Sequence, residues 1–259
     1  MNVVVCVKQI PNADATPAFD PATKTLIRSG PLVLDEADSF SVEMALRCVE
    51  QAGGGEVTLV SVVPNGETGG LRTALAMGAD KAILISDPAL SGLDALGTAK
   101  VLAAAIRRVG AELVLAATES SDGYTGTVPV QLAELLDYPS VSFAKQVAIK
   151  DGGLEVHRQT EDGYDEVVCP LPAVVTVTAG VVEVRYPSFK GIMSAKSKPI
   201  EELQVADLGL NSADLGAAGA RQEVIGIEMA ETRTAGETIT DEGEAHSAII
   251  AVLESWKVL

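Results

Sequence analysis

Short apolar runs and longer helical patterns alternate along the first half of the chain. The apolar runs are rich in Val, Leu and Ile, and they predict buried strands at Val3–Val7, Val57–Val63, Ala82–Ile85 and Leu113–Ala117. Apolar residues between and after them recur at helical spacing, which predicts helices that start at Ser39 and that span Gly69–Met77, Leu93–Val109 and Val128–Leu136. Strands that alternate with helices in this way form βαβ units around a parallel sheet.

These strands are apolar along their whole length, so helices should cover both faces of the sheet. The pattern changes after Pro139, where the turn Asp151-Gly152-Gly153 and closely spaced apolar segments predict a β-hairpin region. The segments are Val141–Ile149, Leu154–Arg158 and Glu166–Val177. Residues 12–34 are expected to be irregular. We therefore predict an α/β fold: a three-layer, Rossmann-like, mostly parallel sheet with helices on both faces, plus a β-hairpin region and an extended C-terminal tail.

The tail differs in composition from the rest of the chain. From Pro199 to Ala245 it is acidic, rich in Gly, Ala and Thr, and shows little periodicity. Such a segment cannot form a core of its own, so we expect it to lie against another surface or to be partly disordered. Ala245–Glu254 predicts a short final helix. The expected organisation is an α/β domain over residues 1–198 and a C-terminal extension over residues 199–259.

Net charge and composition narrow the classes of function. The 259 residues carry a formal net charge of −17, which argues against a nucleic-acid-binding protein, because phosphate neutralisation requires a broad basic surface. The cysteines are scattered and the chain has only two histidines, so a zinc site is not indicated. There is no GxSxG motif to support a hydrolytic triad. We expect a binding protein rather than an enzyme.

The start of the chain and its apolar stretches bear on localisation. Met1–Ile10 reads as a strand with Lys8 inside it, not as a signal peptide. No apolar stretch approaches the length required to span a membrane. We expect no membrane insertion and a cytoplasmic protein.

The segment after Leu113–Ala117 is the strongest candidate for a ligand site. Ligands of open α/β sheets bind beyond the carboxyl ends of the strands, and a helix N-terminus offers free N–H groups to phosphate. Gly123 and Gly126 would allow close approach of the backbone. The segment contains neither a Walker A loop nor GxGxxG, so a nucleotide site and an ordinary polar loop both stay open, with the nucleotide site favoured. Hydroxyl groups are supplied by Ser120, Ser121, Thr125 and Thr127.

Acidic residues precede the helix that is predicted from Ser39. Asp35, Glu36 and Asp38 stand where the helix dipole favours negative charge, so capping is the favoured interpretation. They also follow a strand-like Leu-Val-Leu, and the alternative is that they line a ligand cleft.

The stretch Arg185–Pro199, RYPSFKGIMSAKSKP, differs from its surroundings. It carries cations, no acid and two aromatic residues, although aromatics make up 3% of the chain. Pro187, Gly191 and Met193 suit a projecting loop with an adaptable apolar tip. A solvated basic loop is the simpler interpretation, but the combination favours a docking patch for an acidic protein partner.

Several motifs together resemble the β subunit of electron-transfer flavoproteins, including its actinobacterial members. They are VCVKQIP near the start, RTALAMGADKAIL at Arg72–Leu84, LPAVVTV followed by VRYPSFKGIMSAKSKPI within Leu171–Ile200, and TAGETITDEGE near the end. The resemblance covers essentially the whole chain. It implies a heterodimer in which the α subunit holds most of one FAD, while the β subunit completes the complex and usually carries a buried AMP.

The resemblance also implies which residues bind AMP, and it makes nucleotide binding the expected role of the loop after the fourth strand. On the first two strands and before the first helix, the implied residues are Cys6, Asp35, Glu36, Ala37, Asp38 and Val62. In the loop they are Ala117, Thr118, Glu119, Ser120, Ser121, Asp122, Gly123, Tyr124, Thr125, Gly126, Thr127 and Val128.

A recognition loop over residues 185–198 is implied as well. In the family this loop docks acyl-CoA dehydrogenases and related flavin enzymes, so that electrons pass to FAD and on to a quinone reductase. Phe189 stands where the family commonly has Leu. The implied docking residues are Arg185, Tyr186, Pro187, Ser188, Phe189, Ile192, Met193 and Lys196.

Two places depart from the family pattern. Asp165 replaces a Glu that helps to orient the flavin domain, and Val182-Glu183-Val184 replaces Asn-Glu-Pro before the recognition loop.

Two other functions stay open. The first alternative is an electron-bifurcating subunit that holds a second FAD in place of AMP. The second is a stand-alone adenine-nucleotide-binding domain of the universal-stress type, which lacks a recognition loop and a long tail. The C-terminal extension is expected to pack on the α subunit.

Overall fold

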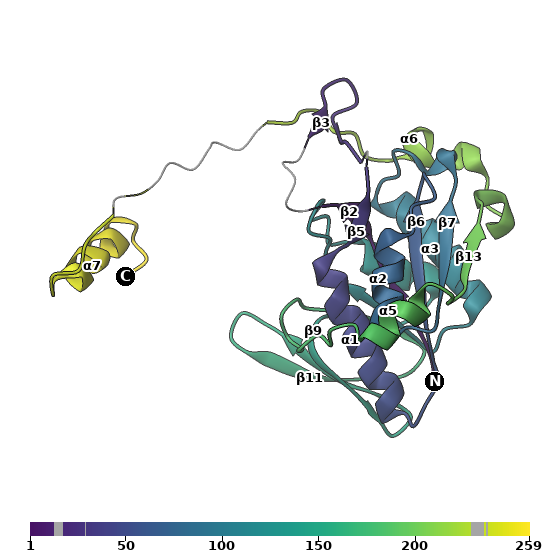
Figure 1. The fold of residues 1–259 in the computed structure, drawn as a ribbon, viewed down its shortest axis with the longest axis horizontal. Helices are drawn as coiled ribbons and strands as arrows, with labels where there is room; N and C mark the ends of the chain where they lie inside the picture. Colours follow the sequence, from purple (N-terminus) through teal and green to yellow (C-terminus); the bar gives the residue numbers. More distant parts are fainter. Residues whose placement is uncertain (13–17, 29, 229–235, 237) are drawn as a thin grey trace. The chain divides into compact units, whose positions relative to one another are not determined.

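A computed structural model describes residues 1–12, 18–28, 30–228, 236 and 238–259 (Figure 1). The chain divides into two compact units, Met1–Ile225 and Gly226–Leu259. The predicted motif TAGETITDEGE falls partly outside the described residues.

The first unit is built on a nine-stranded sheet in the order β11-β10-β9-β12-β8-β1-β6-β7-β13. Neighbouring strands from β9 to β13 along this order run parallel, whereas β9, β10 and β11 pair antiparallel. The mostly parallel α/β sheet and its hairpin region are therefore confirmed. The strands are β1 (Asn2–Cys6), β6 (Glu56–Val63), β7 (Lys81–Ser86), β8 (Leu113–Ala117), β9 (Ser140–Lys150), β10 (Gly153–Gln159), β11 (Tyr164–Cys169), β12 (Ala173–Val177) and β13 (Ile200–Leu203).

Helices cover both faces of the sheet, as predicted. Val3 and Val5 of β1 pack into a core shared with α1 (Glu36–Gln51) and α2 (Gly69–Met77). Val4, which points the other way, packs into a core shared with α3 (Ala95–Val109) and α4 (Val128–Leu136). The alternation of β1 side chains between two cores produces the three layers.

Two of the expected elements have different bounds in the structure. The first helix starts at Glu36, not Ser39, because the Asp35 carboxylate accepts a hydrogen bond from the Ala37 N–H and caps it. The predicted strand Glu166–Val177 is two strands, β11 and β12, separated by a segment with Pro170 and Pro172, which lack the N–H that a ladder requires.

The described parts of residues 12–34 contain short strands, although this region was expected to be irregular. β3 (Phe19–Asp20) pairs with β4 (Thr25–Leu26), and β5 (Leu32–Leu34) pairs with β2 (Gln9–Pro11), which precedes the region. Both pairs are antiparallel and lie outside the main sheet.

The chain beyond residue 198 first completes the sheet. Strand β13 pairs in parallel with β7 at the sheet edge, and Leu203 and Val205 are buried in the core. Short helical turns follow: η2 (Val205–Leu208), η3 (Ser212–Asp214) and α6 (Gly216–Gly219). The compact α/β unit therefore extends to Ile225, beyond the boundary at residue 198 that the sequence suggested.

The second unit contains one helix, α7 (Ala245–Ser255), among the residues that the structure describes. Ile249, Val252 and Trp256 recur at helical spacing and share one face, whereas Ser247 and Glu254 lie on the opposite face. No residue of α7 is buried. In the described part of the chain, no helix has the length and apolar character that crossing a membrane requires.

Candidate functional site

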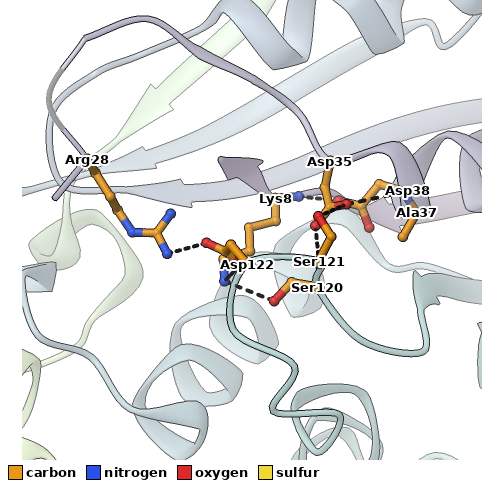
Figure 2. A network of polar contacts seen from close by, with 8 residues as sticks. All are labelled: Lys8, Arg28, Asp35, Ala37, Asp38, Ser120, Ser121 and Asp122. Atoms are coloured by element: carbon orange, nitrogen blue, oxygen red, sulfur yellow. Dashed lines mark hydrogen bonds and ion pairs between the residues drawn. The ribbon is translucent and has the colours of Figure 1, made fainter. Parts of the chain in front are cut away.

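The candidate ligand site lies beyond the carboxyl ends of the parallel strands β1, β6 and β8. Lys8 comes just after β1, Asp35 caps α1, and the loop of residues 118–127 connects β8 to α4. Figure 2 shows these segments meeting, with the side chains of Lys8, Asp35, Asp38 and Asp122 gathered in one polar network.

Asp35 joins the start of α1 to the loop after β8. Its side chain is fully buried. One carboxylate oxygen accepts the Ser121 N–H at 2.8 Å, and the other accepts the Ser121 hydroxyl at 2.9 Å and the Ala37 N–H at 3.2 Å. Its own N–H donates to the Lys8 carbonyl at 3.0 Å. Asp35 therefore caps α1, as the sequence favoured, and the same carboxylate also holds the loop after β8.

Asp38 lies in the first turn of α1, not before the helix, and it is buried. Burial raises the pKa of this carboxyl to about 8, although the Lys8 N–H, which donates to it at 2.5 Å, acts in the opposite direction. Burial, with a smaller contribution from Asp38, also raises the pKa of the Cys6 thiol to about 12. The Cys6 thiol is therefore protonated at neutral pH.

Asp122 is held between two cations. The Lys8 ammonium donates to one oxygen at 2.6 Å and to the Ser120 hydroxyl at 3.1 Å, and the Arg28 guanidinium donates to the other oxygen. Burial opposes ionisation of Asp122, but Lys8 and then Arg28 outweigh it and lower the pKa of the carboxyl. Lys8 and Arg28 were not among the residues expected in the site. The only sequence signal for Lys8 was its place after an apolar strand.

The other residues expected to bind a ligand have different surroundings. Thr118 turns toward β12, where its hydroxyl lies 3.2 Å from that of Thr176. Cys6 and Val62 are half-buried at the ends of β1 and β6, Ala37 is half-buried, and Glu36 is exposed. Much of the loop is exposed to solvent, including Glu119, Ser121, Gly123, Tyr124, Thr125 and Thr127.

The predicted recognition loop over residues 185–198, called the docking segment below, contains a short helix, α5 (Phe189–Ala195), and is not only a loop. The Ser188 hydroxyl caps it by accepting the Gly191 N–H at 3.0 Å. Tyr186 and Phe189 are 95% and 81% exposed, and Ile192 and Met193 are about half exposed. Large apolar side chains that face solvent together are typical of a protein interaction surface.

The cations of the docking segment are not all unmatched, which corrects the sequence interpretation. Arg185 donates to the buried Glu43 carboxylate with its Nε at 2.7 Å and to Glu50 with its Nη1 at 3.0 Å. The Lys198 ammonium donates to the carbonyls of Leu75 at 3.0 Å and Ala79 at 2.5 Å. These acceptors lie on α1 and at the end of α2, far from the segment in sequence, so no local pattern indicated them.

Asp165 lies on β11 and is paired within the chain. It accepts a hydrogen bond from the Arg158 guanidinium of β10 at 2.5 Å, and both side chains are about half exposed. The adjacent Tyr164 ring stacks on His157 with ring centroids 4.6 Å apart. Among the described residues, no cluster of His, Cys, Asp or Glu could hold a metal ion.

Comparisons with known proteins identify relatives over the whole length. The family model described as "Electron transfer flavoprotein domain" matches residues 23–208. "Electron transfer flavoprotein subunit beta" of Mycobacterium tuberculosis is 37% identical over 264 aligned positions, which cover 100% of this chain and 99% of the relative. The protein of the same name from Thermoanaerobacterium thermosaccharolyticum is 38% identical over 242 positions, 93% of this chain and 92% of the relative. "Caffeyl-CoA reductase-Etf complex subunit CarD" of Acetobacterium woodii is 36% identical over 242 positions, with the same coverage.

Proposed function

The chain belongs to the electron transfer flavoprotein family as a β subunit, and on this basis we propose that it is the docking and nucleotide-binding half of a heterodimeric electron carrier. Its partner α subunit holds most of the FAD, which accepts and releases the electrons. This chain binds AMP beyond the carboxyl ends of β1, β6 and β8, and it docks acyl-CoA dehydrogenases through the segment 185–198. The electrons then pass to a quinone reductase. The chain performs no bond-making step.

The network around Asp35 and Asp122 is the observation that carries the nucleotide assignment. Asp35 fixes Ser121, and Asp122 fixes Lys8 and Arg28, so the loop after β8 is held in one conformation with two cations beside it. Lys8 and Arg28 retain further N–H groups, which supply charge for a phosphate.

The start of α4, which follows the same loop, adds backbone donors except at Pro129, which has no N–H. Thr127, its N-cap residue, makes no side-chain hydrogen bond to the N–H groups of the first turn. A helix N-terminus with uncapped N–H groups favours an anion. The exposed Gly123 would carry a Cβ only 3.6 Å from the Lys8 ammonium, so its lack of a side chain keeps the approach to that cation open. These residues fit a nucleoside monophosphate such as AMP.

The second unit supports the assignment of a partner subunit. The apolar face of α7, with Ile249, Val252 and the C-cap residue Trp256, is not covered by any of the residues that the structure describes in its own unit. A helix with one apolar face requires a surface on which to bury it. We propose that this surface belongs to the α subunit.

A ligand count on the co-expressed αβ complex tests the proposal. The complex is denatured, and the released nucleotides are separated and quantified per heterodimer. One FAD and one AMP are expected. Two FAD and no AMP would replace the proposal by that of a bifurcating subunit, and no adenine nucleotide beyond the α-bound FAD would contradict a site beyond these strand ends.

A further inference from the structure

A groove separates α2 from the docking segment. Its volume is about 600 Å³. One wall is formed by Arg72, Thr73 and Ala76 of α2, and the other by Pro187, Ile192, Ala195 and Lys196. Most of the lining is apolar, and the space accommodates a large aliphatic or aromatic side chain.

Hydrogen bonds fix the width of this groove. The Arg72 guanidinium donates to the carbonyls of Ala195 at 2.6 Å and Lys198 at 2.8 Å. Lys198 in turn donates from its ammonium to carbonyls at the end of α2. A Cβ at Gly191 would lie 2.5 Å from the Ala76 carbonyl oxygen, so only glycine permits this approach of α5 to α2. The groove is therefore preformed, which lowers the entropic cost of filling it.

The chain's own neighbouring side chains do not fill the groove. Phe189 and Tyr186 are almost fully exposed, so their rings lie outside it. At the start of the segment, Arg185 is held to α1 by Glu43, which is 2% exposed and receives the Arg185 N–H at 3.2 Å as well as the Nε at 2.7 Å. With both ends anchored, the segment keeps its place beside the groove.

The charges around the groove define the occupant. Arg72 and Lys196 line it, and none of the described residues that line it is acidic. In the described residues, neither Lys190 nor Lys196 has an ion-pair partner. The chain as a whole has a net charge of −17, so this is a local basic rim on an acidic protein. The basic rim favours an acidic partner, whereas two copies of this chain would repel each other through their large negative net charges.

We propose that docking is reciprocal: the electron-donating flavoenzyme inserts one large apolar side chain, flanked by carboxylates, into the groove between α2 and α5. The exposed Phe189 ring contacts the same partner at a separate point. This inference rests on the proposed docking function and adds a receptor site to it.

Filling the groove tests the inference. Thr73 is exposed on α2 and lines the groove, so Thr73→Trp occupies the space without entering the core. The FAD-loaded αβ complex is mixed with a purified acyl-CoA dehydrogenase reduced by its acyl-CoA, and the rate of flavin reduction in the complex is measured against dehydrogenase concentration. We expect Thr73→Trp to raise the half-saturating concentration roughly tenfold, equivalent to about 1.4 kcal/mol, with the maximal rate and FAD content unchanged.

Two further variants complete the design. Thr73→Ser keeps the groove open and should behave as wild type. Lys196→Glu should also raise the half-saturating concentration, and it should reverse the sensitivity of that concentration to salt, because the rim would then repel an acidic partner.

The outcomes separate this inference from the function on which it rests. If Phe189→Ala weakens docking but Thr73→Trp does not, the dehydrogenase docks without the groove and the inference is overturned. If sedimentation shows an association of wild-type complexes that Thr73→Trp abolishes, the occupant is a second copy and the inference is again overturned. A wild-type complex that accepts no electrons from the dehydrogenase would overturn the docking function and the inference together.

Discussion

The carboxylate of Asp35 accepts two hydrogen bonds from Ser121, one from the backbone N–H at 2.8 Å and one from the hydroxyl at 2.9 Å. The two residues belong to different βα connections, and their contact joins the start of α1 to the loop after β8. Since Asp35 also caps α1, a single buried side chain determines the position of both segments. This contact makes the proposed nucleotide site dependent on the fold of the first helix.

Asp35→Ala should therefore weaken both stability and nucleotide retention. Loss of the cap costs about 1 kcal/mol, and loss of the buried bonds to Ser121 brings the total to about 2–4 kcal/mol. Calorimetric unfolding of the purified αβ complex and its AMP content measure the two effects. Ser121→Ala removes only the hydroxyl bond and should cost about 1 kcal/mol; an equal loss in the two variants would contradict the central position of Asp35.

Asp38 predicts a pH dependence of stability. Its pKa in the folded chain is about 8, because of burial, whereas an unfolded aspartate has a pKa of about 3.9. The folded state thus retains a proton that the unfolded state releases. The contribution of Asp38 to stability is fully present below about pH 4 and is lost as the pH rises through about 8.

Asp38→Asn, which imitates the protonated carboxyl, should remove this dependence. Between pH 5 and 8 the thermal midpoint of the wild-type complex should fall more steeply than that of the variant. Asp137→Asn, which alters the C-cap residue of α4, provides a control with the same chemical change. Parallel curves for wild type and Asp38→Asn would show that Asp38 is ionised throughout the range.

Local signals explain why some elements could be predicted from the sequence to the residue. The bounds of α2 and α4 agree with the prediction, and Gly78 and Gly110 end α2 and α3 as expected. These ends depend on a positive φ that glycine adopts without strain. β13 could not be predicted in the same way, because Ile200–Leu203 contains two acids and becomes a strand only through pairing with the edge of β7.

The residues of the candidate site also differ in whether the neighbouring sequence could predict them. The loop after β8 was predicted from its composition and its place between a strand and a helix. Arg28 was not, because it reaches Asp122 across 94 positions of sequence. Arg185 was interpreted as a free cation, whereas Glu43, 142 positions away, neutralises it. Contacts of this kind depend on the packing of whole elements, which periodicity does not specify.

Glu43 is expected to position the docking segment. Burial opposes its ionisation, but hydrogen bonds from Arg185 and Arg47 outweigh burial and lower the pKa of the carboxyl. Glu43→Gln removes the charge that holds Arg185, so the half-saturating concentration of the dehydrogenase should rise about three- to tenfold, by roughly 0.7–1.4 kcal/mol. The maximal rate and the FAD content should not change, since we expect Glu43 to act on docking through Arg185.

Two variants distinguish positioning from a general loss of stability. Glu50→Gln removes the other, exposed carboxylate on Arg185 and should have little effect, because exposed ion pairs contribute little. Glu43→Asp keeps the charge and should restore part of the docking affinity. If Glu43→Gln lowers the thermal midpoint but leaves the half-saturating concentration as it is, the residue stabilises α1 alone.

The apolar face of α7 should bind the α subunit. Ile249 lies in the middle of that face and is 56% exposed. Ile249→Asp places a charge where an apolar contact is expected, and should weaken association of the two subunits at least tenfold, or about 1.4 kcal/mol. Ser247→Asp adds the same charge on the opposite face of α7 and should leave association unchanged.

Dilution of the αβ complex, with FAD fluorescence as the readout of dissociation, compares the variants. Equal dissociation constants for Ile249→Asp and wild type would exclude this face from the subunit interface, and a loss caused by Ser247→Asp alone would assign the interface to the polar face of the helix.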